Sequence, residues 1–298
     1  MPGKISSSST PHGLIPFLVG ALVGCGSAFI CMSLVIGRGN RASLGWTNKA
    51  GGIIANTKEA ARPRVVCFGD SLTQQGFVAE RLGWLALLAN WWERRFDVIN
   101  RGFSGYNTRW LLPLVDRLFV PDGVAPTKLV TIFLGANDCV LPGVSQHVPI
   151  EEYKDNLRLM VEHVRRVLPR ARLLLITPPS IHEAKWAEYR RMQSREMDRK
   201  LEVTMAYAEA CKEVGKQTSV RVVDAFAATG SGDVAFADKC FRDGLHFTSE
   251  GNRAVFEAIQ KEILLSFPEL DPEHVDKQAP HHADVDPDNY RDSVLGSL

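Results

Sequence analysis

Short apolar runs rich in β-branched residues alternate with helical stretches through most of this chain, and this alternation constrains its fold more than any other feature. Strands that alternate with helices are typical of a parallel sheet covered by helices on both faces. No repeat of fixed period accompanies the pattern. The sequence therefore predicts an α/β domain over Arg64–Phe267, with strands at Arg64–Phe68, Asp97–Asn100, Leu129–Leu134, Leu173–Thr177 and Val220–Val223.

Four helices are predicted from apolar residues that recur every three or four positions. Lys185–Lys216 is a longer helical stretch, either continuous or broken. The four helices are predicted at Glu80–Arg95, Arg109–Phe119, Ile150–Leu168 and Glu250–Phe267.

An uncharged, largely apolar stretch from Gly13 to Gly37 precedes the predicted domain. As a helix rising about 1.5 Å per residue, it can cross a hydrocarbon core of roughly 30 Å, so we expect one transmembrane helix in a single-pass membrane protein. A cleaved signal peptide is the main alternative, although its apolar region spans only about 7 to 15 residues. The basic residues that follow favour a cytoplasmic catalytic domain. They are Arg38, Arg41, Lys49, Lys58, Arg62 and Arg64.

The remaining segments are a polar N-terminus (1–12), a linker (38–63) and a C-terminal extension (268–298). The formal net charge of +1 and the absence of a basic stripe argue against nucleic acid as a partner. The cysteines are widely spaced and form no C-x-x-C pair, so we expect buried, reduced thiols and no metal site. No cofactor is expected, and a homodimer is left open.

The loop Gly69–Thr73 follows the first predicted strand. Ligands of open α/β sheets bind beyond the carboxyl ends of the strands, so polar residues there are candidates for chemistry. At the opening of a helix, Ser71 would place its hydroxyl in that crevice and its N–H toward an oxyanion. A simple helix cap is the alternative interpretation of this serine.

Asp243 and His246 lie three residues apart in the loop before the last predicted helix. A serine hydroxyl needs a base to become a nucleophile at neutral pH, and the base needs a carboxylate that fixes its tautomer. This loop contains both groups. Alone, Asp243 could be a turn former and His246 a surface residue.

Two further loops contain candidate oxyanion donors. Gly105 follows the second strand, where a glycine allows a backbone N–H to approach a substrate closely. Asn137 follows the third strand, and its side-chain NH₂ is a neutral donor suited to a developing oxyanion. Each motif taken alone is equally compatible with an ordinary turn.

In order and spacing, these four blocks resemble the SGNH (GDSL) hydrolase superfamily and, more narrowly, the isoamyl acetate-hydrolysing esterase family. The resemblance implies a flavodoxin-like fold with five parallel strands. It also implies that Ser71 is the nucleophile, that the N–H of Ser71, Gly105 and Asn137 form the oxyanion hole, and that His246 is the base oriented by Asp243. The matching blocks are Phe68–Gly76, Asn100–Arg109, Gly135–Asp138 and Asp243–His246.

The sequence therefore predicts a serine ester hydrolase that works through a covalent acyl-enzyme. The resemblance favours short-chain carboxylic esters, and lysophospholipids or thioesters are the alternative because of the apolar N-terminal stretch. Aromatic side chains are expected to flank the substrate crevice. They are Phe77, Phe103, Tyr106, Trp110 and Phe247.

Three other classes compete with this interpretation. An α/β-hydrolase would have Gly-x-Ser-x-Gly, whereas Thr73 occupies the position of the second glycine. A membrane-tethered binding protein with a decayed site would not need all four blocks intact. A metal-dependent phosphoesterase would need more histidines than this chain offers near its candidate ligands, which would be Asp70, Asn137, Asp138, Asp243 and His246.

Overall fold

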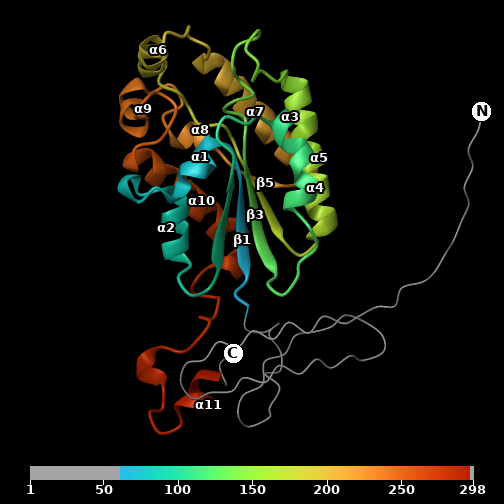
Figure 1. The fold of residues 1–298 in the computed structure, drawn as a ribbon, viewed down its shortest axis with the longest axis vertical. Helices are drawn as coiled ribbons and strands as arrows, with labels where there is room; N and C mark the ends of the chain where they lie inside the picture. The colour runs from blue at the N-terminus through green and yellow to red at the C-terminus, as the bar shows by residue number, and fades with distance from the viewer. Residues whose placement is uncertain (1–60, 296–298) are drawn as a thin grey trace, which may run out of the picture. The chain divides into compact units, whose positions relative to one another are not determined.

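A computed structural model describes residues 61–295 and shows a single five-stranded parallel sheet in the order β2-β1-β3-β4-β5 (Figure 1). This is the strand order of flavodoxin-like folds, and it reverses direction between β1 and β3. Each predicted strand is present, with its ends shifted by at most two residues. The strands are β1 (Arg64–Gly69), β2 (Asp97–Gly102), β3 (Thr127–Phe133), β4 (Arg172–Ile176) and β5 (Arg221–Val223).

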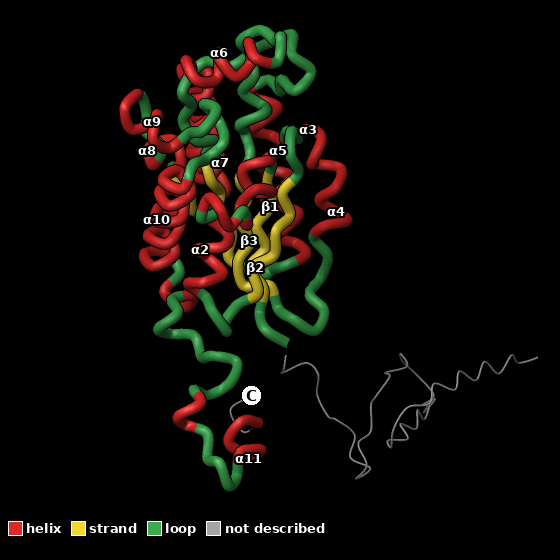
Figure 2. The backbone as a smooth tube through the Cα atoms, turned by 60° about the vertical axis from the view of Figure 1, so that its left-hand side comes forward, coloured by secondary structure: helices red, strands yellow, loops and turns green. Residues whose placement is uncertain are grey.

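Helices cover both faces of the sheet, as Figures 1 and 2 show from two directions. Helices α2 (Trp84–Trp91) and α10 (Ser249–Ser266) lie on one face, and α5 (Ile150–Val167) and α7 (Leu201–Thr218) lie on the other. Shorter helices are α1 (Ser71–Gln74), α3 (Thr108–Leu111), α4 (Val115–Leu118), α6 (Glu183–Met192), α8 (Ala225–Ala228), α9 (Val234–Cys240) and α11 (Tyr290–Leu295). The 3₁₀ turns are η1 (Gln75–Phe77), η2 (Ala79–Arg81), η3 (Leu112–Leu114), η4 (Pro268–Leu270) and η5 (His282–Asp284).

The two-residue period of a strand explains why the buried part of the central strands is almost entirely apolar. In β1, Val65 and Cys67 pack against the face covered by α2 and α10, whereas Val66 and Phe68 pack against the face covered by α5 and α7. Because successive side chains point to opposite faces and both faces are buried, nearly every central position must be apolar. Burying this surface from both sides is the main source of the domain's stability.

Two predicted helices are interrupted in the structure, and the longer helical stretch, for which a break was left open, is broken. The helix expected at Glu80–Arg95 begins only at Trp84, because Leu82 is in the left-handed conformation (φ 47°) and ends a 3₁₀ turn. Pro113 lies in the 3₁₀ turn that separates α3 from α4, so Arg109–Phe119 is not one helix. Lys185–Lys216 is broken into α6 and α7 around Ser194, which also has a positive φ.

The first part of the C-terminal extension lies against the end of α2. The indole N–H of Trp92 donates to the carbonyl oxygen of Leu270, and the guanidinium of Arg95 donates to that of Val275. The N–H of Gln278 donates to the carbonyl oxygen of Arg94. These contacts tie residues 270–278 to the domain by hydrogen bonds to main-chain carbonyls.

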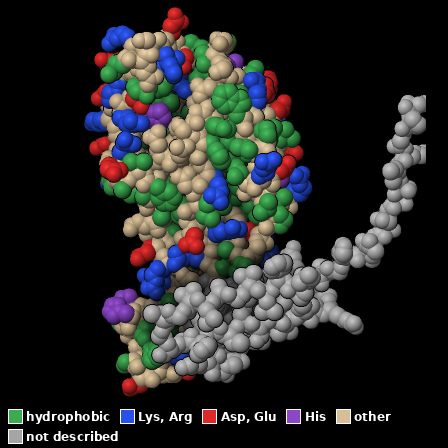
Figure 3. Space-filling model, viewed as in Figure 1, with side chains coloured by type: hydrophobic (Ala, Val, Ile, Leu, Met, Phe, Trp, Pro, Cys, Tyr) green, Lys and Arg blue, Asp and Glu red, His purple; other side chains and the backbone are tan. Residues whose placement is uncertain are grey.

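The predicted transmembrane stretch 13–37 lies outside the described residues, as do Cys25 and Cys31. Within 61–295, no helix is long and apolar enough to cross a membrane. Cys67, Cys139, Cys211 and Cys240 are buried free thiols. On the face drawn in Figure 3, acidic and basic side chains are interspersed, which agrees with the near-zero net charge of the chain.

Candidate active site

The candidate residues from four loops meet at one end of the sheet. Ser71 follows β1, Gly105 follows β2 and Asn137 follows β3, so they gather where the strand order reverses. His246 joins them from the loop before α10. All four residues line one hollow with a volume of about 170 Å³. This is the position at which open α/β sheets bind ligands.

Ser71 is the first residue of α1. A helix cap and close backbone packing fix the turn that precedes it. The Asp70 carboxylate accepts a hydrogen bond from the N–H of Leu72 at 2.9 Å and so caps the helix. Gly69 has no space for a side chain, because a Cβ there would lie 2.5 Å from the carbonyl oxygen of Phe133. The turn therefore lies directly against β3, and Ser71 is 5% exposed.

Ser71, His246 and Asp243 form a continuous chain of hydrogen-bonding contacts. Ser71 Oγ lies 3.1 Å from His246 Nε2, and His246 Nδ1 lies 2.8 Å from Asp243 Oδ2. The other carboxylate oxygen of Asp243 accepts from the N–H groups of Leu245 and His246. Burial would raise the pKa of Asp243, but these hydrogen bonds and the nearby imidazole lower it to about 2. The carboxylate is thus charged at neutral pH and accepts from Nδ1–H, which leaves Nε2 free to accept a proton from Ser71.

The loop that contains Asp243 and His246 is closed at its base by the bridge between Phe241 and Phe247. At its tip, Gly244 has φ +96°, and a Cβ there would lie 2.4 Å from the backbone nitrogen of Trp186. The carbonyl oxygen of Gly244 accepts from the N–H of His182, just before α6. Glycine is therefore required twice, for the left-handed backbone and for this close approach.

Three candidate oxyanion donors belong to residues that line the hollow. Gly105 has φ +80°, and its N–H and that of Ser71 donate to no other residue among 61–295. The carbonyl oxygen of Gly105 is held by Gln146 Nε2. Asn137 donates one N–H of its side chain to the carbonyl oxygen of Tyr106 at 2.9 Å, which leaves its second N–H for a ligand. Together these groups form a set of donors suited to an oxyanion.

Asp138, the neighbour of Asn137, joins two of these loops. Its Oδ1 accepts from both the N–H and the hydroxyl of Thr108, and Asn156 on α5 donates to the same hydroxyl. All three residues are buried. Asp138 therefore aligns the start of α3, and the Gly105 loop before it, with the Asn137 loop.

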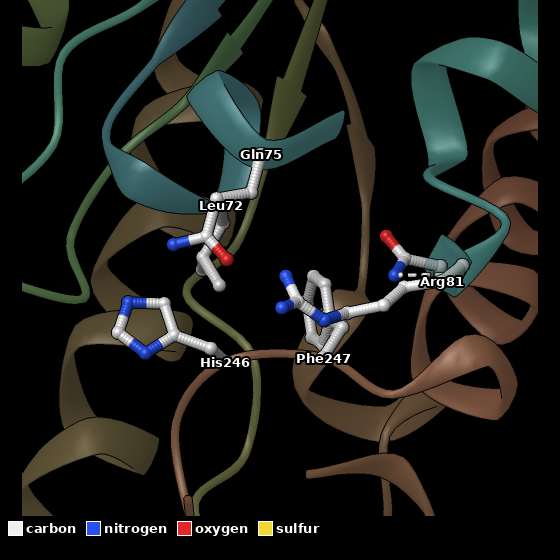
Figure 4. Close-up of a pocket in the computed structure, with 6 residues that line it drawn as sticks. Leu72, Gln75, Arg81, His246 and Phe247 are labelled. Atoms are coloured by element: carbon white, nitrogen blue, oxygen red, sulfur yellow. Dashed lines mark hydrogen bonds between the residues drawn. The ribbon is translucent and has the colours of Figure 1, made fainter. Parts of the chain in front are cut away.

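The aromatic residues expected around the crevice do not line this hollow. Phe247 packs against Phe133 and Phe241, and with Leu72, Gln75, Arg81 and His246 it lines a separate narrow hollow (Figure 4). Tyr106 contacts both Phe103 and Trp110, Phe103 also packs against Phe68, and Phe77 is 41% exposed. None of these five side chains lines the hollow that contains Ser71.

Helix α6 and the loop after it supply the other wall of the hollow, and none of these residues is among the candidates predicted from the sequence. The arginines of this stretch are the only signal in the sequence that marks it. Its lining side chains are Trp186, Tyr189, Arg190, Gln193, Arg195, Asp198 and Arg199.

Asp70 and Asp138 are buried carboxyl groups below the serine turn. Burial raises the pKa of Asp70 to about 7, and repulsion by Asp138 also raises it. The hydrogen bond from the N–H of Leu72 lowers the pKa but only partly offsets these effects. Burial likewise raises the pKa of Asp138 to about 6, against hydrogen bonds from Thr108. A carboxyl with a raised pKa binds its proton more tightly in the folded state, so its contribution to stability is lost as pH rises through that window.

We therefore expect the free energy of unfolding of Asp70→Asn to rise relative to that of wild type as pH increases from about 4 to 8. Over this range the variant should gain about 2–4 kcal/mol of stability relative to wild type, since one pKa unit corresponds to about 1.4 kcal/mol. Urea titrations of both proteins at several pH values measure it. A difference independent of pH would show that Asp70 titrates normally in the folded protein.

Comparison with known proteins shows which family this chain belongs to. The GDSL-like lipase/acylhydrolase family model matches residues 67–254. A GDSL esterase/lipase from Arabidopsis thaliana is 38% identical over 236 residues, covering 76% of this chain and 96% of that protein. An isoamyl acetate-hydrolyzing esterase 1 homolog from Bos taurus is 41% identical over 207 residues, covering 68% and 82%. The crystal structure of a lipase/acylhydrolase from Enterococcus faecalis has the same fold, with TM-score 0.52 and 22% identity over 72% of this chain and 98% of that one.

Proposed function

Because this chain belongs to the GDSL-like lipase/acylhydrolase family and is a carboxylic ester hydrolase, we propose that it cleaves short-chain esters through an acyl-enzyme on Ser71. The observation that carries this proposal is the contact series from Ser71 through His246 to Asp243, beside three donors in one hollow. A nucleophile, a base, an orienting carboxylate and an oxyanion site are the parts that acyl transfer requires.

In the proposed first step, His246 Nε2 removes the proton from Ser71 Oγ as the oxygen attacks the ester carbonyl. The imidazolium that forms is stabilised by Asp243, which stays ionised. The carbonyl oxygen becomes an oxyanion, which accepts hydrogen bonds from the N–H groups of Ser71 and Gly105 and from Asn137. His246 then gives the proton to the leaving alcohol, and the acyl group remains on Ser71.

The second step uses the same groups on water. His246, neutral again, removes a proton from a water molecule that attacks the acyl carbonyl. The oxyanion forms in the same place, and its collapse returns the proton from His246 to Ser71 as the acid leaves. One set of donors thus serves both transition states, so a change at an oxyanion donor affects both steps.

The size and chemistry of the hollow support a short acyl group. Its volume is about 170 Å³, and most of the side chains around it are polar or charged. A long alkyl chain gains free energy only by burying its methylene groups against apolar surface, at about 0.8 kcal/mol per CH₂. Trp186 and Leu245 supply a small apolar area, which is enough for an acetyl-sized or slightly larger group.

A series of p-nitrophenyl esters from acetate to palmitate tests this preference. We expect kcat/KM to be highest for acyl chains of about two to four carbons and to fall at least about tenfold by octanoate. A maximum at long chains would favour lysophospholipids instead, and faster turnover of acyl thioesters than of matched esters would favour a thioesterase. No hydrolysis of any ester above the Ser71→Ala background would refute the proposed activity.

Replacement of Asn137 by alanine removes one of the three oxyanion donors. We expect kcat to fall about 10²- to 10³-fold with little change in KM, because the hydrogen bond to the oxyanion exists chiefly in the transition state. Steady-state kinetics on p-nitrophenyl acetate measure this change. An unchanged kcat would remove Asn137 from the proposed site.

We retain the proposal that residues 13–37 anchor the protein in a membrane, with the catalytic domain on the cytoplasmic side. Its basis is the uncharged apolar length of the segment and the basic residues after it. The full-length protein should resist extraction by alkaline carbonate, and a truncated protein beginning at Gly51 should be soluble and keep kcat/KM within about twofold, since every site residue lies downstream. Release of the full-length protein by carbonate would contradict the anchor.

A further inference from the structure

Arg199 is a buried arginine beside the oxyanion donors, and no part of the mechanism above uses it. It lies just before α7, and only 3% of its surface is exposed. Within residues 61–295 no carboxylate lies within ion-pair distance of its guanidinium. A buried, unpaired cation costs several kcal/mol unless polar groups solvate it, so its surroundings need an explanation.

The guanidinium is directed at the backbone and side chain of the Asn137 loop. One terminal nitrogen donates to the carbonyl oxygen of Ala136, and the other donates to Asn137 Oδ1 at 3.0 Å. The planar group lies over the ring of Trp186, 5.1 Å from its centre. Arg199 is therefore held on one side by an aromatic face and on the other by two acceptors in the loop after β3.

These contacts determine which way the Asn137 amide faces. An arginine has only donors, so the oxygen of the amide must face Arg199 and its NH₂ must face the other way. The NH₂ then donates to the carbonyl oxygen of Tyr106 and has one N–H left for the hollow. If the amide were flipped, it would present an acceptor to the oxyanion, and the two negative partial charges would repel.

The charge of Arg199 has a second effect on the same group. A cation hydrogen-bonded to an amide oxygen withdraws electron density from the nitrogen, which makes the N–H a stronger donor. The neighbouring carboxylate, Asp198, does not neutralise it, since Asp198 pairs with Arg190 and accepts from the indole of Trp186.

We propose that Arg199 is a positioning residue that fixes the amide of Asn137 with its N–H toward the oxyanion and strengthens that donor. The inference rests on the proposed function, in which Asn137 stabilises the oxyanion. Arg199 acts through Asn137 and the Ala136 carbonyl rather than on the substrate. Its effect on the rate must therefore depend on the presence of the Asn137 amide.

A double-mutant cycle with Asn137→Ala tests this dependence. Arg199→Met should lower kcat about 10- to 10²-fold on p-nitrophenyl acetate and change KM by less than about threefold, since the lost interaction belongs to the transition state. In the Asn137→Ala background the same substitution should cost less than about threefold further. Arg191→Met, which removes an exposed arginine of α6 that does not line the hollow, should leave kcat unchanged.

Arg199→Lys keeps the charge and should retain more activity than Arg199→Met. It should still lose about three- to tenfold in kcat, because one ammonium group does not reproduce the fork that reaches both acceptors. If Arg199→Met fails to fold, as judged by circular dichroism and thermal unfolding, Arg199→Lys and its combination with Asn137→Ala test the inference instead. The loss of kcat caused by Arg199→Lys should likewise disappear in the Asn137→Ala background.

Two results would overturn the inference. A wild-type kcat in the Arg199 variants that fold would show that the arginine is dispensable, and equal losses with and without Asn137 would show that it acts independently of that amide. Both results can be told apart from failure of the proposed function itself. If the proposed function were wrong, Ser71→Ala would remain active, or Asn137→Ala alone would keep a wild-type kcat.

Discussion

Replacing Ser71 by alanine is expected to lower kcat by about 10⁴- to 10⁶-fold, because it removes the nucleophile of the proposed acyl-enzyme. Ser71 is 5% exposed and has its Oγ 3.1 Å from the proposed base, so alanine fits the space and removes only the reacting oxygen. Steady-state rates on p-nitrophenyl acetate measure the loss. Ser266→Ala, at the far end of α10, is the matched control and should keep full activity.

A loss smaller than about tenfold in Ser71→Ala would contradict this assignment, since oxyanion donors without a nucleophile retain only a small part of the catalysis. Such a result would require water to attack the ester directly in the wild-type enzyme. The thermal unfolding temperature of the variant, measured in parallel, separates loss of chemistry from loss of fold.

His246→Ala is expected to have an effect of similar size, about 10⁴-fold or more in kcat, because the Ser71 hydroxyl is then left without a base. The groups of such a site act as a unit, so the double variant Ser71→Ala, His246→Ala should be no slower than either single variant within about threefold. Kinetics of the three variants measured together test this. Losses that multiply in the double variant would mean that Ser71 and His246 do not act in one step.

Most of the fold was predictable because strand positions depend on short-range signals. Runs such as Leu129–Leu134 and Leu173–Thr177 are short, mostly apolar and followed by turn residues, a pattern typical of a strand buried on both faces. Helix ends were less accurate. The left-handed residue Leu82 and the 3₁₀ turn at Pro113 divide helices that have continuous apolar periodicity in the sequence.

The proposed catalytic residues were found from the sequence because each lies in a short motif at the end of a strand or before a helix. Assigning these residues to one site also requires the strand order, because it places the loops after β1 and β3 side by side. The resemblance to a known family supplied that information. Composition and periodicity alone predicted the layers but not this order.

The walls of the substrate hollow could not be predicted in this way. Phe247 follows His246 directly in the chain, yet it closes the base of the loop and packs into the core, whereas His246 lies in the bend of the loop and contacts Ser71. Conversely, Arg199 is far from Asn137 in the sequence and meets it only because the break between α6 and α7 brings the loop over the site. Contacts of this kind depend on tertiary packing, for which a single sequence has no local signal.

Covalent labelling at Ser71 tests the central claim most directly. Wild-type protein is treated with a fluorophosphonate, which reacts with activated serine hydroxyls, and the modified residue is located by mass spectrometry of peptides. We expect stoichiometric labelling on Ser71, strong suppression of labelling in His246→Ala, and none in Ser71→Ala. Equal labelling of wild type and Ser71→Ala, or labelling at another serine with retained esterase activity, would contradict the account.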